Sequence, residues 1–121
     1  MEKDIYSDEK KIEIIAILSD DEDKAIVIAK LSNQKMKLDE LSKLKNEYAK
    51  AFVIESLSND NIKLTELSKI KEDFHKETVI ESFTNEDNKI NALSQLSSDY
   101  SKKMIIINFS NEGKKLKHYH N

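Results

Sequence analysis

The chain has no cysteine, no proline, no tryptophan and only one glycine among its 121 residues. Without cysteine it can form neither a disulfide framework nor a thiolate metal site, and its redox compartment cannot be read from cysteine usage. Without proline and with a single glycine it lacks the residues that usually stop helices, so Asn and Asp are expected to supply the turn geometry. All 20 basic residues are lysine, because the sequence contains no arginine.

A long apolar run is also missing. The N-terminal stretch Met1-Glu2-Lys3-Asp4 lacks the charged and then apolar pattern of a secretory signal, and no stretch approaches membrane-spanning length. We therefore expect a soluble protein in the cytoplasm or another intracellular compartment. The abundance of Ile, Asn, Ser, Asp and Lys is typical of an AT-rich genome, and an effector delivered into a host cell would fit that composition.

What the chain does contain is a pattern with a 13-residue period. Lysine recurs at this spacing as Lys11, Lys24, Lys37, Lys50, Lys63, Lys76, Lys89, Lys102 and Lys115. An acid stands three residues before each of these lysines except Lys37, where Gln34 takes its place. This acid-x-x-Lys motif thus marks all but one of the 13-residue halves of a longer repeat.

The full repeat is a 26-residue unit, because the apolar pattern alternates between successive halves. In the odd halves apolar residues recur at every third position, as at Leu64, Leu67 and Ile70. In the even halves an adjacent pair such as Val53-Ile54 is followed by one more apolar residue, here Leu57. Spacings of three indicate helix rather than strand.

One continuous helix cannot carry this pattern, because each half-repeat, at about 100° per residue, turns an apolar stripe by roughly 220°. The chain must therefore break and turn back after each half. Ser, Asn and Asp recur at these breaks, where their side-chain oxygens can cap the next helix. The acid favours the first helical turn, and the lysine one turn later is expected to be its ion-pair neighbour.

We predict an all-α fold, an α-solenoid of antiparallel short-helix pairs with eight helices and a short ninth. The predicted helices span residues 8–18, 21–31, 34–44, 47–57, 60–70, 73–83, 86–96, 99–109 and 112–119. Residues 1–121 would form a single repeat domain, with repeats at about 5–30, 31–56, 57–82 and 83–108 and a partial repeat at 109–121.

The apolar pattern also predicts which faces are buried. The even helices carry wider apolar arcs and should be sandwiched between layers, whereas the odd helices should face solvent on one side. Buried side chains are predicted at Leu41, Ile54, Leu67, Ile80 and Leu93.

The paired helices and repeated apolar positions resemble the HEAT/armadillo group of α-solenoids, over residues 8–119 and in architecture only. The 26-residue unit is much shorter than the repeats of that group, and their characteristic Pro, Asp and Arg positions are absent. No residue roles can be carried over. Since such solenoids generally bind other proteins, the resemblance implies a non-enzymatic protein-binding scaffold.

The lysine row has a functional and a structural interpretation. A row such as Lys37, Lys63 and Lys89 could follow a phosphate backbone and bind nucleic acid. Most of these lysines, however, have an acid three residues earlier, the net charge is −3 and arginine is absent. The structural interpretation, a charge-balanced pair on each helix, is therefore preferred.

An aromatic row follows the same 26-residue spacing at Tyr48, Phe74 and Tyr100, with Glu22 in the first repeat. Such a row could hold a peptide or stack on exposed bases. Packing of each helix start against the preceding helix is the preferred interpretation.

The three histidines give only weak evidence for a binding or metal site. His75 stands where other repeats have Ala49 and Ser101, so we expect an exposed, variable site there. His118 and His120 could contribute metal ligands, but two histidines without cysteine are a weak signal. No catalytic, cofactor-binding or metal-binding residues are predicted, and an enzyme is not expected.

The two ends of the repeat array carry surplus apolar residues, at Ile14 and Ile17 and at residues 104–107. Since solenoid ends usually need polar caps, this surplus fits missing repeats, a docked partner or self-association. Membrane binding is disfavoured, because the short helices need their apolar faces for one another.

Our first hypothesis is a scaffold that binds another protein over several repeats, with Tyr48, His75 and Tyr100 as candidate contacts. Nucleic-acid binding through the lysine row and a self-associating spacer are the alternatives.

Overall fold

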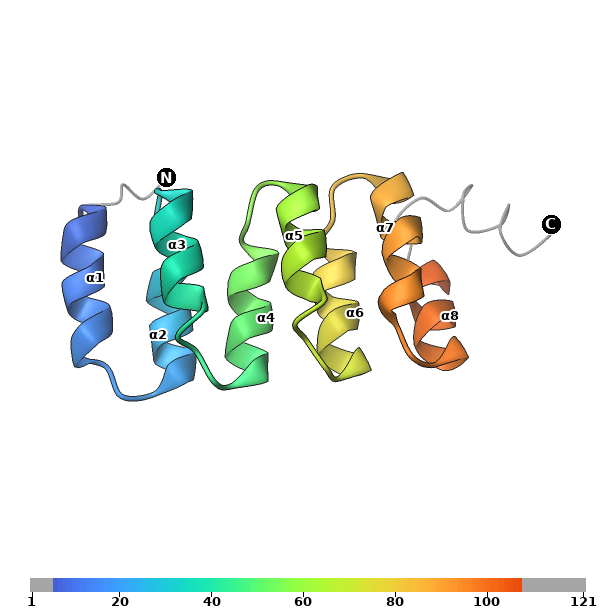
Figure 1. Cartoon of the computed structure of the whole chain (residues 1–121), viewed down its shortest axis with the longest axis horizontal. Helices are drawn as coiled ribbons and strands as arrows, with labels where there is room; N and C mark the ends of the chain where they lie inside the picture. The colour runs from blue at the N-terminus through green and yellow to red at the C-terminus, as the bar shows by residue number, and fades with distance from the viewer. Residues whose placement is uncertain (1–5, 108–121) are drawn as a thin grey trace. The chain divides into compact units, whose positions relative to one another are not determined.

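The computed structural model describes residues 6–107, and this part of the chain is all-helical, with eight α-helices and no strand (Figure 1). The helices are α1 (Asp8–Ile17), α2 (Asp21–Ile28), α3 (Gln34–Leu41), α4 (Glu47–Glu55), α5 (Asp60–Leu67), α6 (Asp73–Glu81), α7 (Glu86–Ala92) and α8 (Asp99–Ile107). A short 3-10 helix, η1 (Leu93–Gln95), follows α7. The all-α prediction is confirmed, and the predicted ninth helix at 112–119 lies outside the described residues.

The helix starts agree with the sequence pattern. All eight helices begin at the first residue of the motif and so follow its 13-residue period. In most cases the residue before the start caps the helix: Asn46 Oδ1 accepts a hydrogen bond from the Ala49 N–H at 2.9 Å, and Ser7 Oγ accepts one from Lys10 at 3.1 Å. Such bonds satisfy N–H groups that have no partner inside the helix.

Helices α1 to α7 end earlier than predicted, and the predicted end of α8 at residue 109 lies outside the described residues. Helix α3, for example, ends at Leu41, whereas the apolar pattern predicted residue 44. The Leu44 N–H instead bonds the Leu41 carbonyl at 3.1 Å, and the Ile70 N–H bonds the Leu67 carbonyl at 3.0 Å. This tighter turn still buries the last apolar residue of the half-repeat, as at Leu44 and Ile70.

The turns need no left-handed residue, because no described residue has a positive φ. Asn33, Asn46, Asn59 and Asn85 all have extended backbone conformations and serve as N-caps. Asparagine therefore contributes to the turns through its side-chain oxygen, not through the left-handed geometry that often ends helices. This explains why the described chain manages without glycine and proline.

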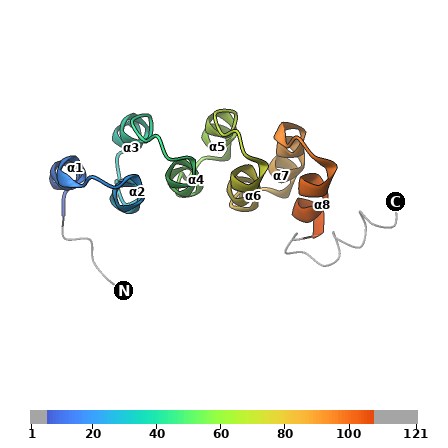
Figure 2. The same ribbon diagram turned by 90° about the horizontal axis from the view of Figure 1, so that it is seen from below.

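The structure divides into two compact units, the first ending at Ser58 and the second beginning at Asn59. In the first unit α2 contacts α1, α3 and α4, and its most extensive contact is with α4. Figure 2 shows α2 and α4 in one row, with α3 in the other. Ile28, Val53 and Ile54 from the α2–α4 row are almost completely buried.

The second unit is built in the same way, with α6 in contact with α5, α7 and α8. Val79 and Ile80 of α6 and Ile105 of α8 are almost completely buried. The even-numbered helices therefore supply most of the core of the first unit, whereas in the second unit the odd-numbered helices and the turns after them bury as many apolar residues as the even-numbered ones do.

Four of the five predicted core side chains are buried, namely Leu41, Ile54, Leu67 and Ile80. Leu93 is only half-buried. The reason is that α7 ends one residue earlier, and Ala92 occupies the fully buried position while Leu93 enters the 3-10 turn.

The prediction that the even helices are sandwiched needs correction. On α2 and α4 in the first unit, Ile26, Tyr48 and Phe52 are exposed, and on α6 and α8 in the second unit Phe74 and Tyr100 are exposed. Each even helix thus buries one side and leaves at least one large apolar side chain exposed on the other.

Candidate functional site

The acid of the motif holds the backbone of a distant loop. Asp8 Oδ1 and Oδ2 accept the N–H groups of Ser32 and Asn33 at 2.9 and 2.8 Å, just before α3 begins. Asp73 makes the same pair of bonds to Ser97 and Ser98 before α8. The acid on one helix therefore positions the start of the helix after next.

These bonds also shift the acids' pKa values. The Ser97 N–H is the main cause that holds the pKa of Asp73 below its usual value, and the Asn46 and Lys45 N–H groups do the same for Asp21. Burial acts to raise the pKa of Asp60, but hydrogen bonds from Asn88, Thr84 and Asn85 together lower it. Hydrogen bonds to the charged form stabilise that form.

The lysine of the motif holds the other side of the same loop. Lys11 Nζ donates to the Lys30 carbonyl at 2.9 Å, two residues before the N–H groups that Asp8 holds. Lys63 Nζ donates to the Ser82 carbonyl at 2.9 Å, and Lys76 Nζ to the Gln95 carbonyl at 2.7 Å. We call an acid and lysine that hold one loop in this way a loop clamp.

The loop clamps correct the expected ion pair within each motif. Asp99 and Lys102 do approach each other, at 3.9 Å. At Lys63 and Lys76, however, the ammonium group donates to a carbonyl 19 residues further along the chain, as does that of Lys37, whose motif has no acid. Sequence spacing within one helix could not reveal this partner, which the packing of the next helix supplies.

The three lysines of the nucleic-acid hypothesis lie away from open surface. Lys37 and Lys63 are buried, with 8% and 3% of their surface exposed, and Lys89 is half-buried. Burial lowers the pKa of Lys37, although Asp8 opposes that shift. A phosphate could reach Lys37 or Lys63 only if their bonds to the loops were broken.

The aromatic row lies on the surface. Tyr48 is 52% exposed, Phe74 67% and Tyr100 65%, and Glu22 in the first repeat is also exposed. The packing interpretation of this row is therefore wrong. The side chains lie at the start of α4, α6 and α8, on the side of each helix that faces away from the core.

His75 is half-buried, which corrects the expectation of an exposed site. The corresponding residues Ala49 and Ser101 are buried, so this repeat position faces the core. The His75 ring lies edge-on to Phe74, with ring centroids 5.4 Å apart. The candidate contacts therefore separate into two exposed tyrosines and one half-buried histidine.

In the first unit, Tyr48 borders a hollow of about 130 Å³ between α2 and α4. The hollow is lined by Glu22, Ala25, Ile26, Tyr48, Ala49 and Phe52. Sequence reasoning missed Ile26 and Phe52, which share one position in successive repeats, four residues after Glu22 and Tyr48. Spacing of four along a helix places side chains on one face and could have found them. We call this surface the α2–α4 face.

The α2–α4 face has an acidic border. Asp20, Glu22 and Asp23 at the start of α2 are exposed, and Glu47 lies at the start of α4. Lys45, just before α4, is also exposed. Among the described residues that line the hollow itself, Glu22 is the one charged side chain.

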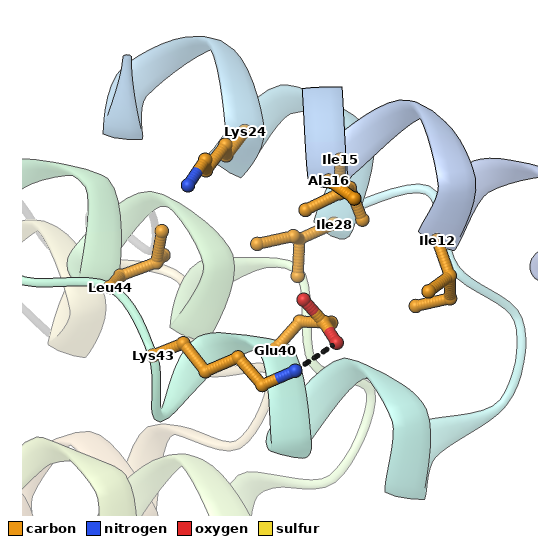
Figure 3. A pocket seen from close by; sticks show the side chains of 8 residues that line it. All are labelled: Ile12, Ile15, Ala16, Lys24, Ile28, Glu40, Lys43 and Leu44. Carbon is orange, nitrogen blue, oxygen red and sulfur yellow. Dashed lines mark hydrogen bonds and ion pairs between the residues drawn. The ribbon is translucent and has the colours of Figure 1, made fainter. Parts of the chain in front are cut away.

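A second hollow, of about 190 Å³, opens among α1, α2 and the end of α3. Figure 3 shows its lining side chains, which are Ile12, Ile15, Ala16, Lys24, Ile28, Glu40, Lys43 and Leu44. Glu40 is 9% exposed, and its Oε2 accepts a hydrogen bond from Lys43 Nζ at 2.9 Å. That bond raises the pKa of Lys43.

The expected self-association surface remains a prediction. Ile17 at the end of α1 is 82% exposed, whereas Ile14 is half-buried. At the other end, residues 104–107 are half-buried or buried. Surplus apolar surface is therefore visible at Ile17 alone among these residues.

Comparisons with protein-family models, curated proteins and solved structures find no match to this chain. Within residues 6–107 no three potential ligand side chains gather around one metal position, and His118 and His120 lie outside that range. None of the helices in the described part of the chain is both long and apolar enough to cross a membrane.

Proposed function

We propose that this chain is an α-solenoid of 26-residue repeats, built from antiparallel helix pairs, that binds another protein without catalysing a reaction. The regular interval between helix starts and the alternation of contacts within each unit support this architecture. The loop clamps support it as well, since Asp8 and Asp60 hold loops at the same distance of 24 and 25 residues along the chain. In a solenoid each repeat contacts its neighbours only.

The observation that carries the binding proposal is the α2–α4 face. Ile26, Tyr48 and Phe52 are 50%, 52% and 39% exposed, and they surround a hollow with an alanine floor. Clustered apolar and aromatic side chains around a hollow are typical of protein-binding surfaces. Tyrosine suits such a surface, because its ring can be buried while its hydroxyl finds a polar partner.

The partner that fits this face is a short helix or peptide with apolar and basic side chains. Its apolar side chains would enter the hollow between Ile26 and Phe52. Its basic side chains would lie beside Asp20, Glu22 and Asp23, where opposite charges speed association and orient the partner. An amphipathic helix in a groove uses anchors at spacings of three and four.

The test compares two designed helical peptides binding to the full chain. One carries leucine on one face and lysine on the other, and its twin carries glutamate in place of lysine. We expect the lysine peptide to bind more tightly, and Phe52→Ser to weaken it about ten-fold, as loss of a central apolar contact does. Fluorescence anisotropy at two salt concentrations gives the affinities.

The matched control is Ile17→Ser, which removes an exposed apolar side chain from α1, outside the face. Its peptide affinity should equal that of the wild type. Equal binding of both peptides, or equal losses in the Phe52 and Ile17 variants, would contradict the proposal.

A further inference from the structure

The hollow among α1, α2 and α3 lies beside a motif lysine without the loop bond that Lys11, Lys37, Lys63 and Lys76 make. Lys24 is the motif lysine of α2, yet the structure records no hydrogen bond from its Nζ to any described residue. Its motif acid Asp21 does hold its loop, through bonds of 2.7 and 2.9 Å from the N–H groups of Lys45 and Asn46 to Oδ2. The loop clamp at α2 is therefore half-formed, and the ammonium group of Lys24 borders the hollow (Figure 3).

In the second unit the lysine at the same repeat position is bonded to its loop, an arrangement that we call the closed form. The counterpart of Lys24 is Lys76, whose Nζ bonds the Gln95 carbonyl at 2.7 Å. The Gln95 side chain in turn donates to the Leu64 carbonyl at 3.4 Å. In the first unit the counterpart of Gln95 is Lys43, which turns to Glu40 instead.

Glu40 is one difference between this hollow and the closed form, where the residue 52 positions later is the fully buried Ala92. The pairing of Glu40 with Lys43 itself recurs at the end of α5, where Lys69 donates to Glu66. By pairing with Lys43, Glu40 draws that side chain to one wall of the hollow and leaves Lys24 at the opposite wall, as Figure 3 shows. In the first unit the lysine-to-loop bond of the closed form is therefore absent at Lys24, and an open hollow with charged groups in its walls is present.

The charges that line the hollow leave one positive charge uncompensated. Glu40 and Lys43 neutralise each other at 2.9 Å, which leaves the ammonium group of Lys24. Asp21 attracts Lys24 but does not line the hollow, and its Oδ2 already accepts two N–H groups. The other lining side chains are apolar: Ile12, Ile15, Ala16, Ile28 and Leu44.

We propose that this hollow binds a small aliphatic carboxylate, with its branched hydrocarbon body against the isoleucines and its carboxylate on Lys24 Nζ. The volume of about 190 Å³ is similar to that of an apolar cavity that admits benzene, roughly 150 Å³. It therefore suits one group of the size of a leucine side chain. Such a group occurs in free branched-chain acids and at the C-terminus of peptides that end in leucine. This proposal does not depend on the α2–α4 face.

The test titrates the ¹⁵N-labelled full chain with two acids and their uncharged amides. The probes are 4-methylpentanoate with 4-methylpentanamide, and N-acetyl-leucine with N-acetyl-leucinamide. Chemical-shift changes should centre on Ala16, Ile28 and Leu44, and at least one acid should bind about five-fold more tightly than its amide. Preference for 4-methylpentanoate indicates a free acid, and preference for N-acetyl-leucine indicates a peptide terminus.

Two variants separate the role of the charge from that of the hollow. Lys24→Gln keeps most of the side-chain length and should abolish the difference between acid and amide. Ala16→Leu adds volume from an exposed position of α1, so it should block every probe without unfolding the chain. Lys45→Gln, which removes an exposed lysine outside the hollow, is the matched control and should bind as the wild type does.

The proposal is overturned if acids and amides bind equally to the wild type, or if Lys24→Gln retains the preference for acids. Shifts that spread over the surface without centring on the lining residues would also overturn it. None of these results affects the peptide test on the α2–α4 face.

Discussion

At the scale of single residues, aspartate and lysine hold loops that lie far from them in the sequence. Asp60 and Lys63 occupy the first turn of α5, yet they bond the backbone on either side of Thr84. A lysine ammonium with a carbonyl partner is stabilised without a counter-charge beside it, and its long stem adds apolar contact. The motif therefore supports several of the turns between helices, through the acid at Asp8, Asp21, Asp60 and Asp73.

Replacing Lys63 by methionine should lower the free energy of unfolding by about 1–3 kcal/mol, because the part-buried Ser82 carbonyl loses its donor. Lys63 is 3% exposed, so methionine keeps the apolar stem in place. Urea denaturation followed by circular dichroism measures the effect. The control Lys35→Met, at a side chain that is 85% exposed, should change the value by less than about 0.5 kcal/mol. Equal effects at both positions would show that Lys63 does not support the loop.

The loop-holding acids predict a specific loss of stability in acid. The folded chain lowers the pKa of Asp73, so between the folded and unfolded pKa values the unfolded state binds more protons. The stabilisation is therefore complete above the unfolded value of about 4 and declines as the pH falls from there through the folded pKa.

Asp73→Asn should lose this stabilisation already at pH 7 and show a flatter profile below pH about 4. Urea unfolding at a series of pH values measures both proteins. Glu13→Gln, at an exposed pair with Lys10, is the control and should keep the wild-type profile. A parallel decline in the wild type and the Asp73 variant would exclude the loop bonds as its source.

At the scale of helices, caps define the starts more sharply than apolar residues define the ends. Nearly every start has a capping residue immediately before the motif, so the sequence places it to the residue. The helix ends are less sharply defined, because the last apolar residue of a half-repeat can be buried from the turn that follows the helix. Leu57, for example, is buried although α4 ends at Glu55.

One cap departs from the pattern and can be improved. Glu72 precedes α6 but its side chain makes no capping hydrogen bond, whereas Asn46 in the same place before α4 does. Glu72→Asn should raise the free energy of unfolding by roughly 0.5–1 kcal/mol, and Asn46→Ala should lower it by about 1 kcal/mol. Thermal and urea unfolding give both values. A destabilised Glu72→Asn variant would mean that the other contacts of Glu72 outweigh the cap.

At the scale of the whole molecule, the proposed solenoid predicts how far local unfolding spreads from a destabilising substitution. Leu67 of α5 is completely buried in the second unit. Leu67→Asp places a carboxylate there at a cost of several kcal/mol, so nearby repeats should unfold first.

Hydrogen exchange should rise most in α5, α6 and α7, and less in α1. Thr65→Asp is the matched control, because Thr65 lies on the exposed side of the same helix. Uniform protection loss over all helices would contradict a solenoid with neighbour contacts only, and unchanged circular dichroism would contradict the repeat register itself.

The sequence alone determined the helical class, the eight helix starts and most of the core, because these follow from local rules. N-caps act within one turn, and the apolar spacing recurs with a 13-residue period at positions such as Leu41, Ile54 and Leu67. Local chemistry needs no knowledge of the partner helix.

Only the tertiary structure decided what the polar and aromatic rows do. The lysine partners lie 19 residues away, and the acid partners 24 and 25, so they exist only once helices have stacked. Exposure of Tyr48 and Phe52, burial of Glu40 and the unbonded ammonium of Lys24 likewise depend on which helix packs against which. A spacing along the chain places side chains on a face, but only packing decides whether that face meets protein or water.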